Sequence, residues 1–265
     1  MAIPTVLIST WGDGLFVVTG QSKRQEFSNQ PVRGLASDGR GGALFIVGGH
    51  SLYRRTPDGA FSALATSELD LACCMAVGDV IYVGTDDARL LRFGGSTSLE
   101  VLRAFDVMAG RDAWYAGSAI IDGRRVGPPL GVRSMTATSD GKVLLVNVHV
   151  GGIPRSTDGG TTWHPTIDID HDVHDVCAHP TRPGLVAAAT ARGLGVSRDG
   201  GATWTVEEEG LHASYCSAVA FLGDDVVVAA STDHFASEGA IYRRAVDRGD
   251  GLTPVESGLP RWTNG

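Results

Sequence analysis

The stretch Ser156–Trp163 reads Ser-Thr-Asp-Gly-Gly-Thr-Thr-Trp, and it returns 41 residues later as Ser-Arg-Asp-Gly-Gly-Ala-Thr-Trp over Ser197–Trp204. A repeat of roughly 40 to 50 residues is typical of the four-stranded blade of a β-propeller. Within each copy, the aspartate offers a short acceptor side chain, and the two glycines adopt positive φ readily, as a tight hairpin requires. The repeat therefore predicts a series of antiparallel blades in which this stretch is a turn between two strands.

The motif Ser-x-Asp-Gly-Gly-x-Thr-Trp resembles the Asp-box, or BNR, repeat of sialidases, xyloglucanases, sortilin-type receptors and photosystem assembly factors. This resemblance implies a β-propeller in which the box forms the turn between strands c and d, on the face away from the active site. It implies structural roles for the box residues, which are Ser156, Asp158, Gly160, Trp163, Ser197, Asp199, Gly201 and Trp204. The N-terminal Phe-Arg-Ile-Pro motif of sialidases is absent from the sequence, so we do not expect a typical sialidase.

The composition is typical of an all-β protein, and the net charge argues against two classes of binding partner. The chain has 265 residues, 36 glycines and a formal net charge of −8, without a basic run. Such a charge argues against nucleic acid and anionic membranes as partners. No apolar segment approaches the roughly 20 residues that span a bilayer, and the first residues lack the features of a secretory signal. We therefore expect a cytoplasmic protein.

The four cysteines are predicted to be free thiols. Cys73, Cys74, Cys177 and Cys216 all lie in apolar, strand-like segments, and none forms a C-x-x-C pair. Buried cysteines of this kind behave as small apolar residues. This pattern again favours a reducing compartment.

Alternating apolar segments separated by turn residues divide the chain into repeat units. We expect one domain, 1–265, with a partial unit at 5–30 and whole units at 32–67, 69–105, 132–168, 172–209 and 213–257. The turn at 56–61 reads as a degenerate box, whereas Gly94-Gly95-Ser96 has lost it. These units predict a six-bladed β-propeller, or a seven-bladed one that is incomplete at its C-terminus.

Residues 106–131 interrupt the repeat. This segment falls between strand d of one unit and strand a of the next, and it contains Trp114, Tyr115 and Gly127-Pro128-Pro129. A connection of this length in a compact domain is uncommon and is often a lid or binding loop. We expect it on the same face as the d-to-a and b-to-c connections, which is called the top face below.

Alignment of the units places several chemically capable side chains together on the top face. Three histidines follow strand b in different units, and three cationic or titratable residues occupy one position near the start of strand a. The candidate ligand-binding residues are Arg33, Arg133, His174, His50, His149, His234, Trp11, Trp114 and Tyr115. A concave site with a few convergent polar groups is where a ligand is expected to bind.

Four functions remain open from these residues. In the first, Arg33 and Arg133 bind the anionic group of a small polar ligand, because a guanidinium matches carboxylate and phosphate geometry. In the second, a glycoside hydrolase acts on a glycan through the top-face aspartates Asp86 and Asp172, since such enzymes use two carboxyl groups.

The third function is that of a metal-dependent enzyme, with a divalent metal bound by His50, His149 and His234 through imidazole nitrogens. The fourth is a protein-interaction scaffold that binds a protein partner on its rim. No cofactor other than such a metal is indicated.

Overall fold

The computed structural model describes residues 4–94, 98–115, 119–121, 124–126, 130–248 and 250–258. The chain forms two compact units, residues 1–102 and 103–265. Within the described residues, six antiparallel sheets of three or four strands follow one another along the chain, three in each unit. In each of these sheets every strand pairs with the next strand in sequence. This is the architecture of a six-bladed β-propeller, as the repeat predicts.

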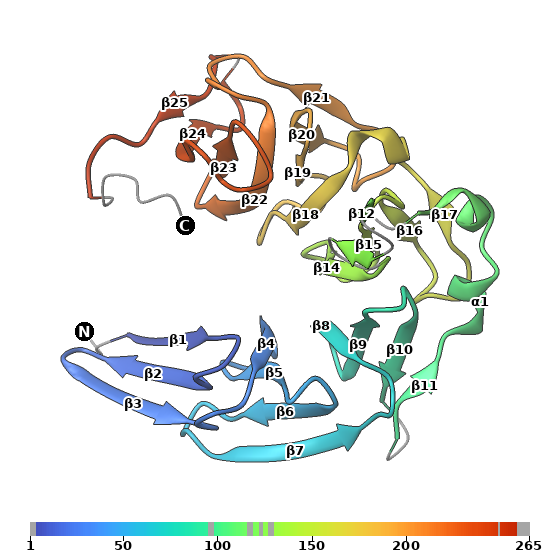
Figure 1. Ribbon diagram of the computed structural model, residues 1–265, viewed down its shortest axis with the longest axis vertical. Coiled ribbons are helices and arrows are strands. Elements are labelled where there is room, and N and C mark those ends of the chain that lie inside the picture. The colour runs from blue at the N-terminus through green and yellow to red at the C-terminus, as the bar shows by residue number, and fades with distance from the viewer. Residues whose placement is uncertain are drawn as a thin grey trace. The chain divides into compact units, whose positions relative to one another are not determined.

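The first unit contains blades 1 to 3, drawn from blue to green in Figure 1. Blade 1 has three strands, which agrees with the partial N-terminal repeat. The strands are β1 (Thr5–Ser9), β2 (Leu15–Thr19) and β3 (Ser22–Glu26) in blade 1; β4 (Val32–Ser37), β5 (Ala43–Val47), β6 (Ser51–Arg55) and β7 (Phe61–Thr66) in blade 2; and β8 (Leu71–Val77), β9 (Val80–Thr85), β10 (Leu90–Phe93) and β11 (Glu100–Val101) in blade 3.

The second unit contains blades 4 to 6. The strands are β14 (Val132–Ala137), β15 (Leu144–Val148), β16 (Pro154–Ser156) and β17 (His164–Pro165) in blade 4; β18 (Val173–Ala178), β19 (Val186–Thr190), β20 (Gly193–Ser197) and β21 (Thr205–Glu207) in blade 5; and β22 (Tyr215–Leu222), β23 (Asp225–Ser231), β24 (Ala240–Ala245) and β25 (Thr253–Pro254) in blade 6. A short 3-10 helix, η2 (Ile169–His171), precedes blade 5.

The predicted interruption before blade 4 has structure of its own. It follows α1 (Arg103–Asp106) and contains η1 (Arg111–Ala113) and a two-stranded sheet of β12 (Ala119–Ile121) and β13 (Arg124–Val126). Gly127-Pro128-Pro129 lies outside the described residues, as do Gly95-Ser96 of the lost box and residues 259–265.

Apolar packing between neighbouring blades supports each unit. Strand β4 packs on β8 in the first unit, and β18 packs on both β14 and β22 in the second. Side chains of one first strand also bond to the backbone of the next: Val176 N–H donates to Ser134 Oγ at 3.1 Å, and Val219 N–H donates to Asp175 Oδ2 at 3.1 Å. These bonds fix the register of adjacent first strands, which carry the candidate site residues.

The turn at Ser156–Trp163 is held by a hydrogen-bond network centred on two side chains. Ser156 Oγ donates to Asp158 Oδ1 at 2.8 Å and accepts from Gly160 N–H at 2.9 Å. Asp158 Oδ1 also accepts the backbone N–H groups of Thr161 and Thr162, at 3.0 and 2.9 Å. These bonds hold the pKa of Asp158 down at about 2, with the Thr162 side chain making the largest contribution. The turn is thus closed by side chains that the motif prescribes.

The second copy repeats this network. Ser197 Oγ bonds to Asp199 Oδ1 and Gly201 N–H, both at 2.8 Å. The two tryptophans differ in their partners: Trp163 Nε1 donates to Gly160 O of its own turn at 3.0 Å, whereas Trp204 Nε1 donates to Thr166 Oγ1 of the preceding blade at 3.1 Å. One indole therefore stabilises its own turn, and the other links two blades.

All four cysteines are free thiols, as predicted. Burial raises the pKa of Cys177 to about 11 and that of Cys216 to about 12. Both thiols therefore stay protonated at neutral pH and act as packing groups.

Candidate functional site

In four blades, a hydrogen bond of the same kind joins the connection after strand b to the connection before strand a, on the top side of the blade. The residue that follows strand b donates its N–H to the residue that precedes strand a. The pairs are Gly48 to Pro31 at 2.9 Å, Asp86 to Asp70 at 2.9 Å, His149 to Gly131 at 3.0 Å, and Ala191 to Asp172 at 3.1 Å. The end of strand b and the start of strand a are therefore neighbours in four blades.

Strand a of blades 4 and 5 has a β-bulge near its start, and this bulge determines the position of the extra residue's side chain. In β14, Val132 pairs with Val148 and Ser134 with Asn147, so Arg133 is the extra residue. In β18, Val173 pairs with Thr190 and Asp175 with Ala189, so His174 occupies the same position. Bulges redirect side chains and are frequent beside functional sites. Arg133 and His174 are thus displaced from the regular alternation of their strands.

The second unit brings His149, Asp172 and His174 into one cluster. His149 Nε2 lies 3.5 Å from Asp172 Oδ1, and His174 Nε2 lies 3.5 Å from Asp172 Oδ2. One nitrogen or oxygen atom from each residue lies within 4.8 Å of the other two. Each residue comes from a different part of the fold, namely the turn after β15, the end of η2 and the bulge of β18.

The orientation of His174 is fixed by two neighbours in blade 6. Its Nδ1 lies 2.6 Å from the carbonyl oxygen of Cys216, and its ring lies 4.5 Å from the ring of Tyr215. Since a carbonyl oxygen only accepts hydrogen bonds, Nδ1 carries the proton. The neutral ring therefore presents a lone pair at Nε2, on the side of Asp172.

Several polar atoms of the cluster are buried without a hydrogen-bond partner among the described residues. They are His149 Nδ1, Asp172 Oδ1 and His174 Nε2. His149 is only 8 % exposed. Buried polar atoms are almost always paired, so a group of unpaired ones in one place calls for an explanation such as an absent ligand or ion.

The charges in the cluster influence one another. Burial is the largest effect on His149 and lowers its pKa; the Asp172 carboxylate opposes this, while electrostatic interactions with Arg133 and His174 lower the pKa further. The pKa of Asp172 is lowered chiefly by His174, against burial, which raises it. The cluster thus favours a carboxylate and a neutral His149.

The turn that carries His149 is unusual in its backbone. Val150 has φ of 50°, a value that is rare for a β-branched residue. The turn is closed by Gly151 N–H, which donates to Val148 O at 2.9 Å, and it is tied to the interrupting segment by Tyr115 N–H, which lies 3.4 Å from Val150 O. Backbone strain of this kind is concentrated at functional sites.

The two aromatic residues of the interrupting segment have different positions. Trp114 is 8 % exposed and packs its ring on Phe105, whose centroid is 5.7 Å away. The Arg111 guanidinium covers Trp114 at 4.7 Å. Tyr115 is half exposed. Trp114 therefore lies in the core beside the His149 turn, and Tyr115 is the one of the two that is accessible to a ligand.

The first unit holds a separate group of predicted site residues. Arg33 Nη2 lies 2.8 Å from Asp86 Oδ2, and the exposed ring of Trp11 lies 5.7 Å from the Arg33 guanidinium. His50 Nε2 lies 3.5 Å from Asp70 Oδ1. The charge of Arg33 is therefore already balanced by Asp86.

The structure thus brings together part of the predicted set and adds partners. His149, Asp172 and His174 converge, with Arg133 close enough to influence the pKa of His149. Within the described residues, His234 is outside this cluster; it is exposed and stacks on Phe235 at 3.8 Å. Tyr215 and the Cys216 carbonyl were not identified from the sequence, because nothing in the local pattern around Tyr215 indicates a contact with His174.

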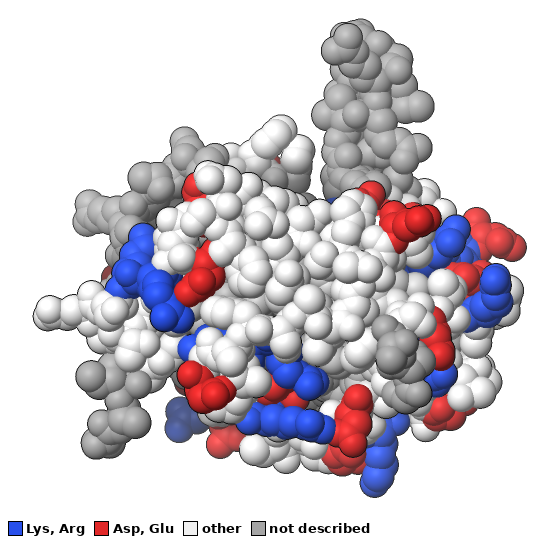
Figure 2. Space-filling model, turned by 90° about the horizontal axis from the view of Figure 1, so that it is seen from below, with Lys and Arg blue, Asp and Glu red and all other residues white. Residues whose placement is uncertain are grey.

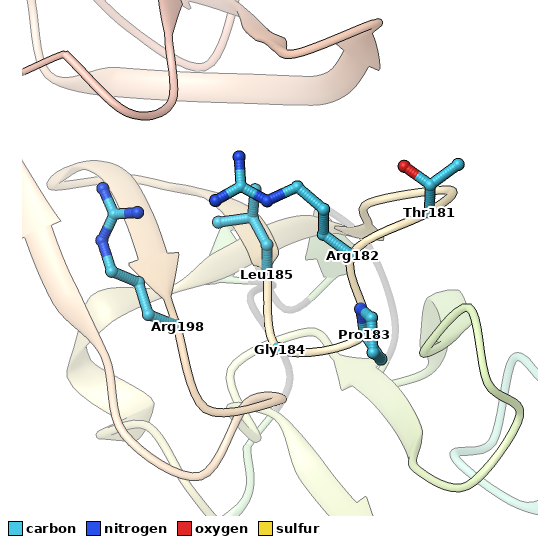
Figure 3. A pocket seen from close by; sticks show the side chains of 6 residues that line it. All are labelled: Thr181, Arg182, Pro183, Gly184, Leu185 and Arg198. Atoms are coloured by element: carbon cyan, nitrogen blue, oxygen red, sulfur yellow. The ribbon is translucent and has the colours of Figure 1, made fainter.

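The second unit also contains an open hollow of about 380 Å³ at its box side, shown in Figure 3. Its two arginines project to the same side of the hollow, but both have partners. Arg182 forms two bonds of 2.8 Å with the Asp247 carboxylate, and Arg198 donates to Val246 O at 2.7 Å. The hollow is lined by Thr181, Arg182, Pro183, Gly184, Leu185 and Arg198. The two arginines that line the hollow are therefore already bound to other groups of the protein.

Surface charge is mixed. Figure 2 shows acidic and basic side chains interspersed on the face that it presents, without a patch of one sign. None of the described helices has the length and apolar character that crossing a membrane requires.

No protein-family model matches the chain, and no curated protein is significantly similar to it in sequence. Two similar solved structures are an ancestral GH74 enzyme, with a TM-score of 0.65 and 13% identity, and a nidogen/laminin complex, with a TM-score of 0.60 and 11% identity. The first match covers 98% of this chain and 33% of the enzyme chain, so this chain spans about a third of that enzyme. The second covers 92% of this chain and 90% of the other. These similarities show the fold.

Proposed function

We propose that this chain is an Asp-box β-propeller that binds a small polar or anionic ligand at the cluster of His149, Asp172 and His174. The observation that carries the proposal is the set of buried, unpaired polar atoms on these three residues. Polar atoms in such a place bind a ligand better than water-exposed ones, because the cost of removing them from water has already been met in folding.

The Asp-box assignment is supported by the turn geometry. Two turns with the same serine and aspartate hydrogen bonds, at Asp158 and Asp199, occur at equivalent places in blades 4 and 5. The degenerate turn at 56–61 keeps both bonds of the first box residue, since Thr56 Oγ1 donates to Asp58 Oδ1 and accepts from Ala60 N–H at 3.1 Å. In each case the side chains close a turn, and the box has a structural role in this proposal.

The anionic character of the ligand is inferred from Arg133, the arginine whose charge acts on the cluster. Arg133 occupies the bulge position of the blade beside His174, and its charge acts on His149. Guanidinium groups bind carboxylates and phosphates in a bidentate manner. Arg33, the other predicted anion-binding arginine, lies in the first unit and is bound to Asp86 at 2.8 Å.

Titration calorimetry with inorganic phosphate and with succinate tests this proposal. We expect Arg133→Ala to weaken binding about tenfold or more, since hydrogen bonds between charged groups contribute about 1.5 to 3 kcal/mol. Arg243→Ala, which removes an exposed arginine of β24, is the matched control and should bind as the unchanged protein does. If neither anion binds, or if both variants bind equally, the anionic ligand is wrong.

A glycoside hydrolase is the second candidate, because one similar structure is a GH74 enzyme. Such an enzyme uses two carboxyl groups; Asp172 of the second unit is one proposed carboxyl group, whereas Asp86 of the first unit is bound to Arg33. Release of reducing sugar from a panel of β-glucans, measured for the unchanged protein and for Asp172→Asn, tests this function. Activity that is lost in the variant supports the hydrolase, and no release from any glycan contradicts it.

Three further properties remain predictions. They are the organisation of 1–265 as a single domain, a location in the cytoplasm, and the absence of nucleic-acid partners. The alternative of a protein-interaction scaffold also remains a prediction; it needs no ligand at the cluster and is therefore excluded if an anion or ion binds there with one-to-one stoichiometry.

A further inference from the structure

In this cluster, His174 and Asp172 present acceptor atoms to each other when the His174 ring is neutral. His174 Nδ1–H is used by the Cys216 carbonyl at 2.6 Å, so its Nε2 carries a lone pair when the ring is neutral. That lone pair faces Asp172 Oδ2 at 3.5 Å, which is too long for a good hydrogen bond. Asp172 Oδ1 is similarly unpaired beside His149 Nε2. Lone pairs that converge in this way repel one another unless a positive charge lies between them.

The donor set is one that metal ions prefer. Two imidazoles and one carboxylate are common ligands of divalent transition metals, and three protein ligands leave positions open for water or substrate. Ligand atoms that lie about 2.0 to 2.2 Å from a shared ion are separated from each other by roughly 3 to 4 Å. The two measured separations of 3.5 Å fall in this range.

The environment of His174 is also typical of a metal ligand. A histidine that binds a metal through one ring nitrogen usually donates its other N–H to a carboxylate or backbone carbonyl, which fixes both tautomer and orientation. The Cys216 carbonyl does this for His174, and the Tyr215 ring at 4.5 Å packs on its face. His149 is held by its strained turn and is more than nine-tenths buried.

We propose that His149, Asp172 and His174 bind one divalent transition-metal ion, with His174 coordinating through Nε2. This inference rests on the proposed function, because both concern the same cluster of three residues. It adds a metal ion to that cluster. An ion with three protein ligands keeps an open position at which the oxygen of an anionic ligand can bind. The predicted ligand set changes accordingly: His149 is retained, and Asp172 and His174 take the places of His50 and His234.

The test is titration of chelator-treated protein with Zn²⁺ alone, in a buffer without phosphate or carboxylates. We expect one Zn²⁺ per chain. Loss of partners outside the ligand set already changes metal affinity about 10- to 100-fold, so His174→Gln and Asp172→Asn should each weaken binding at least tenfold. Asp172→Asn keeps the size of the side chain and serves as the second variant if His174→Gln does not fold.

A matched control is His171→Gln, which removes a partly exposed histidine of the same 168–174 segment whose Nδ1 lies 3.3 Å from Asp168 O. This variant should bind Zn²⁺ as the unchanged protein does. Substitution with Co²⁺ gives a second readout, because its visible spectrum reports coordination by nitrogen and oxygen. The proposal is overturned if no Zn²⁺ binds, or if His171→Gln weakens binding as much as His174→Gln.

The outcome is separable from that of the proposed function. Binding of Zn²⁺ without binding of phosphate or succinate would support the metal site and contradict the anionic ligand. Binding of an anion by the metal-free protein, with no Zn²⁺ bound, would contradict the metal site and support the ligand proposal.

Discussion

His174 Nε2 and Asp172 Oδ2 lie 3.5 Å apart, and the hydrogen bond from His174 Nδ1–H to the Cys216 carbonyl leaves both atoms as acceptors in the neutral site. Such a pair is stable only with a cation between the atoms or with a proton on Nε2. The relationship is produced by the fold, because His174 is the extra residue of a β-bulge and Asp172 has φ of 48° immediately before that strand.

The buried serine of the first box provides a prediction on stability. Ser156 is 1% exposed, and its Oγ is the acceptor of Gly160 N–H. Ser156→Ala leaves this buried N–H unpaired, which should lower the free energy of unfolding by about 1 to 3 kcal/mol. Urea denaturation of this variant and of Ser139→Ala, at an exposed turn position, measures the effect. An equal change in both variants would contradict a structural role for the box serine.

The box aspartates predict a dependence of stability on pH. Hydrogen bonds lower the pKa of Asp158 and of Asp199 from 3.8 to about 2. A carboxylate whose pKa is lower in the folded state stabilises the fold above its unfolded pKa, and this contribution is lost as pH falls through the folded value. Stability should therefore decline between about pH 4 and pH 2. The decline should be shallower in the double variant Asp158→Asn, Asp199→Asn; identical slopes in acid denaturation would show that these groups do not contribute.

Gly201 tests the packing of the second box against the neighbouring blade. Its φ is +79°, and a Cβ there would lie 2.5 Å from Cδ2 of Leu145, which is fully buried. We expect Gly201→Ala to destabilise the protein by about 2 to 4 kcal/mol, from positive φ and overpacking together. Gly223 has φ of +61° and open space around it, so Gly223→Ala should lower the free energy of unfolding by only about 1 to 2 kcal/mol. If thermal unfolding shows the same loss of stability for both variants, overpacking against Leu145 does not contribute.

The ion pair of the first unit gives a fourth prediction. Arg33 and Asp86 have side chains that are 17% and 29% exposed, whereas Arg92 and Glu100 are 42% and 47% exposed. A double-mutant cycle with Arg33→Leu and Asp86→Asn should give a coupling of about 0.5 to 3 kcal/mol. The same cycle on the exposed pair should give about 0.2 to 1 kcal/mol. A coupling near zero for Arg33 and Asp86 would leave Arg33 available for an anion.

The blades could be predicted because their signals are local. Two boxes separated by 41 residues set the period, and the strands of blade 2 run from Val32 to Thr66, within the predicted unit 32–67. Each box carries its own hydrogen-bond partners within eight residues, so the turn follows from the sequence alone.

The composition of the cluster could be predicted only in part. The alignment of units identified His149 and His174 as top-side residues, but it grouped His149 with the other histidines that follow strand b. The bulge in β18 adds one residue and moves His174 out of the regular alternation, and no turn residue marks it in the sequence. The contact of His174 with Tyr215 likewise depends on the packing of β18 on β22.

The most direct measurement is anomalous X-ray diffraction from crystals of the protein grown with Zn²⁺, recorded on both sides of the zinc absorption edge. We predict one strong peak about 2.0 to 2.2 Å from His149, from the Asp172 carboxylate and from His174 Nε2. A map with no peak among these three residues, and with His174 bonded directly to Asp172, would contradict the metal site.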